Sequence, residues 1–529
     1  MHFTTHDQLL LVALLVGLAG LLIAAPILRI PYPIFLVLGG LALGFVPGIP
    51  TLQLPPDVVL VAVLPPLLYS SAFFTSLRDL RANLRPIGML SIGVVLATML
   101  GVAVVAHAFV DSIPWSSAFV LGAVVAPTDP LAATSIMRRL GVPRRVVTIV
   151  EGESLVNDGS ALVFYKVAVT AAVTGAFSFW DASWRFAWSI VGGIAIGLAV
   201  GWAVARVRRR VDDPPVEVTI ALITGYLAFI PAAAAQASGV IAVVTAGTYL
   251  GWRTPELTSV QTRLQGTAVW EIFTFVINAL LFAVVGLQLS SILDSLTGFS
   301  SGTLARYAIL VTGTVIVLRL IWVPLFLLLP KYLSGIIGAD PRPTVGRVAI
   351  VSWSGMRGAV SLAAALAIPL TTHAGAHFPN RELIIFLTFG VILGTLVLQG
   401  LTLPLVIRMW RLEADDSEAA EDAKARIRAA EAALARLDEL ASEEWVREDT
   451  AERMRGLYGF RRDRFASRFD EDSDGAIEEQ SQNYQRLRRE LLDAERDAVT
   501  RLGRDGTISG DVANRVRRDL DLEDARLDV

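Results

Sequence analysis

Eight charged side chains stand inside apolar stretches of this sequence, and they are the residues with the clearest potential for chemistry. They are Asp129, Glu151, Glu153, Asp158, Lys166, Glu271, Arg319 and Arg357. A charged side chain at the centre of a bilayer costs about 2.5–3.5 kcal/mol on insertion scales, so such residues normally face a bundle interior and pair with one another. Eight of them in one chain indicate an ion pathway whose acids bind a cation or a proton.

The segment APTDPLAATSI places Thr128 and Asp129 between two prolines. Proline removes a backbone donor and clashes with the preceding turn, so this segment predicts a helix that unwinds in mid-span. The freed carbonyls and the Thr128 hydroxyl are hard oxygen donors that suit Na⁺ or K⁺. Asp129 is also placed to cap the half-helix that follows, a structural role that is compatible with function.

The segment EGESLVNDGSALV carries the candidate ion-binding acid, Asp158. A spacing of four residues puts Ser154 one helical turn from Asp158, and Glu153 and Asn157 form a neighbouring pair on the same side of the helix. A bare carboxylate is costly inside the membrane, so Asp158 should be neutral, either as the acid or by holding a cation. Taking up H⁺ and Na⁺ by turns is therefore the simplest exchange chemistry available here. The alternative is a hydrogen-bonded, purely structural Asp158.

The segment SWSGMRGAVSLA holds Arg357 between two glycines, and it predicts a second departure from regular helix. Arginine is always charged and therefore needs a partner. Glu153 is the first candidate for that partner and Glu151 the second; a static structural pair and a direct part in transport both stay open. Glu271 and Arg319 are predicted to form a second, fold-stabilising pair.

The composition defines the elements that must position these residues. Of 529 residues, 54% are hydrophobic and 18% charged, and the mean hydropathy is +0.57. Residues 1–411 hold 25 Lys and Arg against 17 Asp and Glu, a net charge of +8, whereas residues 412–529 hold 21 against 32, a net charge of −11. The first region lacks the polar residues to cover a soluble domain. The absence of cysteine excludes disulfides and Cys-bound metal.

Apolar runs of this length are typical of membrane-spanning helices. We therefore predict an all-α polytopic membrane protein with a transmembrane exchange domain over 1–411 and a charged helical tail over 412–529. The thirteen predicted spans are 8–28, 32–47, 57–75, 86–109, 115–137, 146–173, 184–205, 216–234, 238–252, 265–288, 304–330, 347–371 and 383–408.

The charges of the loops predict the orientation. Loops after the odd-numbered spans hold 17 Lys and Arg, and the opposite loops with the N-terminus hold 3. Because basic loops stay in the cytoplasm, the N-terminus is predicted outside the plasma membrane and the tail, a candidate regulatory region, in the cytoplasm.

Two of the predicted spans share the pattern G-x-x-L-G, at 40–44 and 247–251. They lie seven spans apart and so run in opposite directions across the membrane. Inverted repeats of this kind are typical of secondary transporters. The pattern therefore predicts two inverted repeats with the seventh span as the linker.

At these motifs the chain resembles bacterial sodium–proton antiporters, of the electroneutral branch of the monovalent cation–proton antiporter family. The resemblance extends through LPPLLYSSAF and SGVIAVVTAG to the tail segment GTISGDVANRVRRDLDLEDARL. It implies thirteen helices and a homodimer in the lipid bilayer. It also implies a six-helix core moving against an interface domain in an elevator-like way, with the broken fifth and twelfth helices crossing.

The resemblance also implies roles for individual residues. The ion-site acid maps onto Asp158, with Ser154 and the Thr128 backbone as further oxygen donors, an Asp129–Asn157 contact and a Glu153–Arg357 pair. The family's Asn-Asp pair maps onto Asn157 and Asp158, which implies one H⁺ per Na⁺. Some members have Glu where this chain has Ser70, and that Glu contributes to their ion site.

The predicted activity is exchange of a monovalent cation for H⁺, with Na⁺ as the first candidate and K⁺ or Li⁺ as alternatives. No cofactor and no nucleic-acid partner are expected. A passive cation channel is one alternative, but paired charges and broken helices fit alternating access better than a continuous pore. An intramembrane aspartyl protease with an Asp129–Asp158 dyad is another, and the P-T-D-P and V-N-D-G contexts do not resemble those enzymes.

Overall fold

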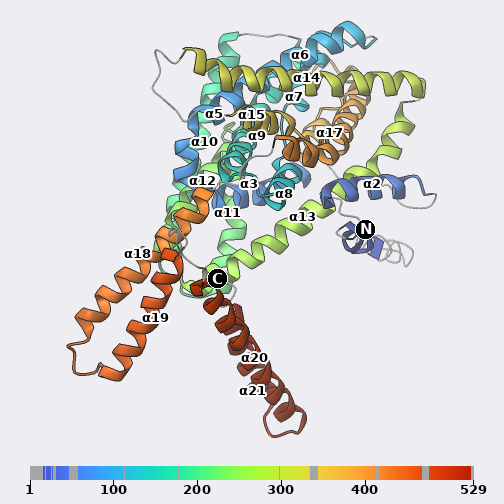
Figure 1. The fold of residues 1–529 in the computed structure, drawn as a ribbon. Helices are drawn as coiled ribbons and strands as arrows, with labels where there is room; N and C mark the ends of the chain where they lie inside the picture. The colour runs from blue at the N-terminus through green and yellow to red at the C-terminus, as the bar shows by residue number, and fades with distance from the viewer. Residues whose placement is uncertain are drawn as a thin grey trace. The chain divides into compact units, whose positions relative to one another are not determined.

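The chain folds into helices that divide into two compact units, Met1–Ala414 and Asp415–Val529 (Figure 1). The computed structural model describes residues 16–17, 19–25, 27, 31–46, 58–111, 113–175, 179–296, 298–333, 344–410, 416–467 and 476–525. The boundary between the units lies close to the one predicted after residue 411.

The first unit contains both continuous and interrupted helices. In chain order they are α2 (Tyr32–Gly44), the π-helical stretch η1 (Val58–Val63), α3 (Leu64–Phe74), α4 (Leu77–Ala82), α5 (Leu84–Gly88), the π-helical stretch η2 (Met89–Val94), α6 (Val95–Phe109), α7 (Trp115–Val124), α8 (Pro130–Arg139), α9 (Arg144–Thr174), α10 (Phe179–Arg208), α11 (Pro214–Ala234), α12 (Gly239–Leu257), α13 (Val260–Ser295), α14 (Ser301–Leu333), α15 (Val345–Trp353), α16 (Ala359–Leu366) and α17 (Arg381–Trp410).

Each predicted span from the second to the thirteenth contains a helix or a broken helix. The first span, 8–28, lies mostly outside the described residues. Among the described helices, six are long and apolar enough to cross a membrane by themselves: Leu84–Phe109, Ser183–Arg208, Pro214–Ala234, Val260–Leu289, Ser301–Leu327 and Arg381–Trp410. The all-helical membrane architecture is therefore confirmed, while the total of thirteen spans stays a prediction.

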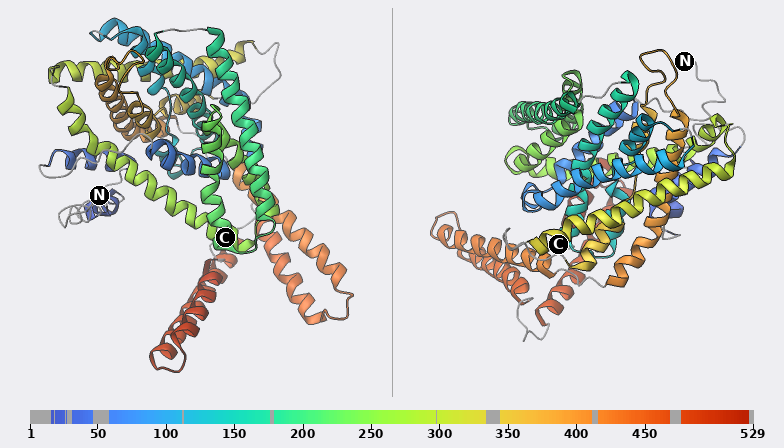
Figure 2. Two further views of the ribbon diagram at one scale, coloured as in Figure 1. Left: turned by 180° about the vertical axis from the view of Figure 1, so that it is seen from behind. Right: turned by 90° about the horizontal axis from the view of Figure 1, so that it is seen from above.

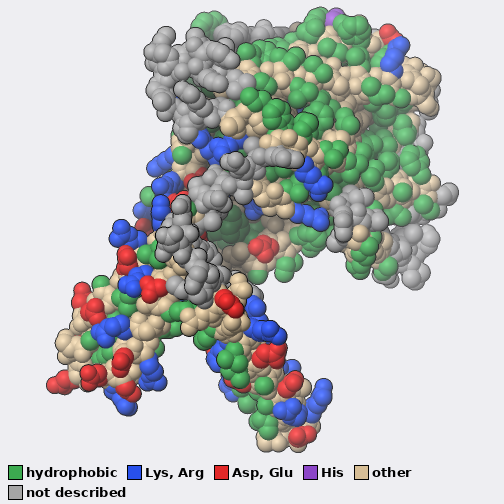
Figure 3. Space-filling view, viewed as in Figure 1, with side chains coloured by type: hydrophobic (Ala, Val, Ile, Leu, Met, Phe, Trp, Pro, Cys, Tyr) green, Lys and Arg blue, Asp and Glu red, His purple; other side chains and the backbone are tan. Residues whose placement is uncertain are grey.

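The outer surface of the first unit is apolar, as a protein surrounded by lipid requires. Figure 3 shows hydrophobic side chains over most of its visible face and Lys and Arg gathered along one edge. Helix α10 exposes large apolar residues such as Trp180 and Trp202, whose exposed fractions are 82% and 63%. In water such a surface would aggregate, so its solvent is the bilayer.

The two G-x-x-L-G segments make equivalent helix contacts in the two halves of the unit. Helix α2 packs along α13, and α12 packs along α3. A Cβ at Gly40 would overlap with the Ala283 carbonyl oxygen of α13, and one at Gly251 would overlap with the Phe73 carbonyl oxygen of α3. If an inverted repeat relates the second and third spans to the ninth and tenth, the α2–α13 contact and the α12–α3 contact are equivalent. The packing supports the inverted repeat, which stays a prediction.

The second unit consists of two helical hairpins (Figure 2). Helix α18 (Asp416–Leu440) packs against α19 (Glu448–Ala466), and α20 (Ala476–Arg504) packs against α21 (Gly510–Ala525). Arg496 links the second pair through Asp521 at 3.0 Å and Asp524 at 2.8 Å. These contacts lie at the surface, where water and salt screen them, so they add little to stability.

The glycine contacts yield the first prediction. Gly251→Ala and Gly40→Ala should each destabilise the protein by about 1–3 kcal/mol, because the added methyl meets backbone that has no rotamer to change. The measurement is thermal unfolding of purified full-length protein. Gly313→Ala in α14 is the matched control, since a Cβ there has nothing within 4 Å. Control-like melting of both test variants would contradict the packing.

Candidate functional site

Two broken helices cross at the centre of the first unit. One is interrupted between Val124, where α7 ends, and Pro130, where α8 begins; the other between the end of α15 and the start of α16. The two breaks touch, because the Asp129 backbone N–H donates to the Met356 carbonyl at 2.9 Å. The breaks predicted from P-T-D-P and from the glycines around Arg357 are therefore confirmed.

Charged residues satisfy the helix ends that meet at this crossing. Asp129 caps α8 by accepting from the Leu131 N–H at 3.0 Å. Arg357 donates from Nε to the Val125 carbonyl at 2.7 Å, at the end of α7, and from Nη1 to the Gly355 carbonyl just beyond α15. Helix N-termini carry partial positive charge and C-termini partial negative charge, so an acid at the first and a cation at the second are favourable.

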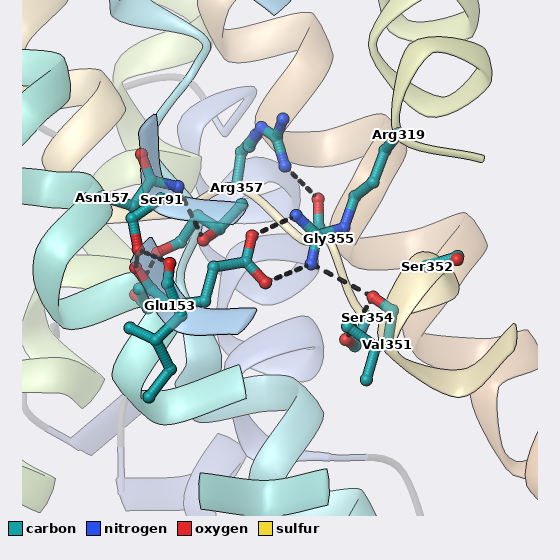
Figure 4. Close-up of polar contacts among 12 residues, drawn as sticks. Ser91, Glu153, Asn157, Arg319, Val351, Ser352, Ser354, Gly355 and Arg357 are labelled. Carbon is teal, nitrogen blue, oxygen red and sulfur yellow. Dashed lines mark hydrogen bonds and ion pairs between the residues drawn. The ribbon is translucent and has the colours of Figure 1, made fainter. Parts of the chain in front are cut away.

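The buried ion pair of the crossing joins Glu153 to Arg319 (Figure 4). Arg319 on α14 donates from Nη1 to Oε1 at 2.5 Å and from Nη2 to Oε2 at 2.8 Å, and Nη2 also reaches the Val351 carbonyl at 3.1 Å. Both side chains are 1% exposed. This two-pronged geometry is the strongest that an arginine and a carboxylate can form.

Both predicted pairings are therefore wrong: Glu153 does not pair with Arg357, and Glu271 does not pair with Arg319. Arg319 reaches Glu153 because it passes over Gly355, where a Cβ would overlap with its side chain. The Arg357 side chain instead donates to backbone carbonyls, and the backbone N–H of Arg357 donates to Thr395 Oγ1 at 3.0 Å. In the described part of the chain, no Lys or Arg nitrogen lies within 4 Å of the Glu271 carboxylate, which is exposed.

The remaining charges on the membrane helices take no part in the buried ion pair. Glu151 forms a partly exposed pair with Arg138 at 2.7 Å, as expected for an interfacial position. Lys166 is exposed on the other half of α9. Neither residue belongs to the buried cluster.

Asp158 is buried, with 5% of its surface exposed, and its Oδ1 has no hydrogen-bond partner among the described residues. Its neighbours along α9 are tied to the break: Ser154 Oγ donates to the Thr128 carbonyl, and Asn157 Nδ2 donates to Thr128 Oγ1 at 3.0 Å. The predicted partner of Asn157 was Asp129, but its amide binds Thr128, the residue just before Asp129. The structure joins Ser154, Asn157 and Thr128 and leaves the Asp158 carboxylate available.

A cavity of about 430 Å³ gives access to this carboxylate. Of the predicted ion-site residues, Asp158, Ser154, Thr128 and Asp129 line it, and Asn157 does not. The opposite wall is formed by α3 and α13, including Ser70, Glu271, Thr274 and Asn278. The Ser70 hydroxyl donates to the Leu67 carbonyl at 2.9 Å, so the α3 wall brings no charge to the site.

Two polar features of the structure were not predicted from the sequence. Ser361 on α16 also lines the cavity and is 1% exposed, but a serine in an apolar helix gave no distinctive signal. Arg208 and Glu217 form a second buried pair, 3.3 Å apart, with Thr262 Oγ1 bonded to the same carboxylate at 3.3 Å. Both lie at helix ends, where the sequence indicated interfacial residues. This pair joins α10, α11 and α13 behind the cavity wall.

The sequence profile of a family described as "Sodium/hydrogen exchanger, transmembrane" matches residues 10–409. The chain belongs to this sodium/hydrogen exchanger family. It is 38% identical over 504 residues to an uncharacterised Na⁺/H⁺ exchanger of Mycobacterium tuberculosis, covering 94% of this chain and 92% of the relative. It is 32% identical to a sodium, potassium, lithium and rubidium/H⁺ antiporter of Bacillus pumilus, covering 80% of this chain and 64% of that one.

The fold has a counterpart among solved structures. The sodium proton antiporter of Methanocaldococcus jannaschii matches with a TM-score of 0.59 at 20% identity, over 76% of this chain and 97% of that chain. The resemblance drawn from the three motifs is therefore confirmed. Family members are transporters, so the crossing belongs to a monovalent cation/proton antiporter and not to a protease.

The ion pair yields the second prediction. Arg319→Ala should destabilise the exchanger by about 3–5 kcal/mol, because it leaves Glu153 buried without a partner. The joint change Glu153→Met with Arg319→Met should recover part of this loss. Thermal unfolding of Glu153→Met, Arg319→Met and Arg357→Met, and of the two doubles that combine Glu153→Met with each arginine change, measures the coupling of Glu153 to each arginine. A stronger coupling of Glu153 to Arg357 than to Arg319 would contradict the pairing.

Proposed function

We propose that the protein exchanges one monovalent cation for one proton by competition at Asp158. The observation that carries this proposal is a buried carboxylate at the crossing of two broken helices, which lines a cavity and has no hydrogen-bond partner at Oδ1 among the residues that the structure describes. Transporter sites near the middle of a bilayer are typically built from such broken helices. Na⁺ is the first candidate cation, and K⁺ and Li⁺ are alternatives that the name of the Bacillus pumilus relative supports.

The net charge of the side chains at the crossing favours the binding of one ion with a single positive charge. The ionisable groups there are the carboxylates of Glu153, Asp129 and Asp158 and the guanidiniums of Arg319 and Arg357, and their charges are counted here with every group ionised. Three carboxylates and two guanidiniums leave one negative charge. One H⁺ or one monovalent cation at Asp158 makes the cluster neutral, and a neutral cluster avoids the cost of moving charge through the bilayer. Asn157, which is uncharged, adds no second titrating group.

The walls of the cavity support alternating access. Helices α8, α9 and α16 form one side, and α3 and α13 form the other. The cavity also includes Arg138, which adjoins the basic loops predicted to be cytoplasmic. The arrangement supports an inward-facing state, from which an elevator-like shift of the broken-helix group past α3 and α13 carries Asp158 outward. A homodimer in the plasma membrane, with the tail in the cytoplasm, completes the proposal.

The third prediction tests competition at Asp158. Apparent cation affinity should weaken as pH falls, with KM rising about tenfold per pH unit at acid pH, because by mass action H⁺ occupies the same carboxylate. Maximal rates at saturating cation should change little. The measurement is cation-driven pH change in proteoliposomes of full-length protein across a series of pH values.

Variants of Asp158 and a neighbour complete this test. Asp158→Asn is nearly isosteric and should fold but not exchange. Asp129→Asn should keep more activity, since an amide oxygen still caps α8. A KM that is constant across the active pH range, or cation-dependent proton movement by Asp158→Asn, would refute the competition.

A further inference from the structure

A second buried oxygen shares the cavity of Asp158 and also lacks a partner. The Ser361 hydroxyl on α16 is within a side chain that is 1% exposed, and in the described part of the chain it makes no hydrogen bond. Both Ser361 and Asp158 line the same cavity of about 430 Å³, and their helices, α16 and α9, pack against each other. An unpaired buried hydroxyl normally costs about 1–3 kcal/mol, so its retention calls for a reason.

The break in the helix explains why Ser361 has no local partner. Two other buried serines of this unit donate to the carbonyl four residues earlier: Ser352 to Val348 at 2.8 Å and Ser91 to Ile87 at 2.6 Å. Ser361 is the third residue of α16, which begins at Ala359, so the residue four positions earlier belongs to the break. In the described part of the chain its hydroxyl binds no carbonyl, and Ser361 lines a cavity that also contains a carboxylate.

We propose that Ser361 Oγ is a ligand of the transported cation, supplied by the second broken helix. This rests on the proposed function, because it takes the cation to bind at Asp158. A hydroxyl oxygen is a hard, neutral donor that suits an alkali cation, and its proton is free to point toward a carboxylate while a lone pair faces the ion. Ser154 and Thr128 are already bonded to each other. Ser361 thus adds an uncommitted oxygen from the α16 side and makes the ion bridge both broken helices.

The test compares three substitutions of Ser361 in proteoliposomes of full-length protein. Ser361→Ala should raise the cation KM at least about fivefold, as expected for losing one contact to a charged group, with a maximal rate near wild type. The size of the increase should differ among Li⁺, Na⁺ and K⁺, because removing one ligand alters the fit to each ionic radius. Ser361→Thr keeps the hydroxyl and should restore the KM. Ser361→Cys supplies a soft sulfur and should behave like alanine.

Ser352→Ala is the matched control, since it removes a buried hydroxyl that is bonded to backbone and does not line the cavity; it should leave every KM unchanged. Equal KM values for wild type, Ser361→Ala and Ser361→Cys would overturn the proposal. So would a shift of the pH profile that is the same for all three cations, since that result makes Ser361 a hydrogen-bond donor to Asp158. Asp158→Asn separates the two levels: if it still exchanges, the proposed function fails, whereas if it is inactive and Ser361→Ala is silent, only this inference fails.

Discussion

The cost of unbalanced charge inside the bilayer is the constraint on which the rest of this structure depends. Glu153 and Arg319 neutralise each other through two short hydrogen bonds. Asp129 and Arg357 are balanced differently, by the N-terminus of α8 and by carbonyls at the ends of α7 and α15. Asp158 alone among these groups has a carboxylate oxygen without such a partner in the described residues. Asp158 is thus the carboxylate at the crossing that, in the proposed function, a proton or a cation from the cavity neutralises.

The two helix breaks make this arrangement possible. A continuous helix has its carbonyls and N–H groups satisfied internally and offers nothing to a charged side chain. Interruption frees the ends of α7, α8, α15 and α16 at one point, where the Asp129–Met356 backbone bond holds them together. The buried Glu153–Arg319 pair then ties α9 to α14 beside the crossing. The residues that hold the helix ends together are for this reason also the residues that form the candidate site.

Much of the site was predictable because its signals are local in the sequence. Prolines around Thr128 and Asp129 break a helix wherever they occur, and four-residue spacing places Ser154 beside Asp158 on any helix. The choice of ion-pair partner was not local. Arg319 and Arg357 are both buried cations near Glu153, and what decides between them is that Gly355 leaves room for the Arg319 side chain. Such a packing detail depends on the relative position of α14 and α15, which no spacing rule encodes. The length of an apolar run likewise cannot predict where Pro or a π-helical stretch interrupts a span.

In the proposed function, the crossing becomes electrically neutral with one bound proton or one bound monovalent cation. A direct test is the rate of Na⁺-driven proton movement in proteoliposomes whose membrane potential is set by a gradient of the permeant anion thiocyanate, because a K⁺ gradient could itself drive exchange. The account predicts the same initial rate at zero, inside-negative and inside-positive potential, and no uptake of charge during exchange. A rate that rises or falls steadily with the imposed potential, after correction for proton leak, would show that net charge crosses with the ion and would contradict it.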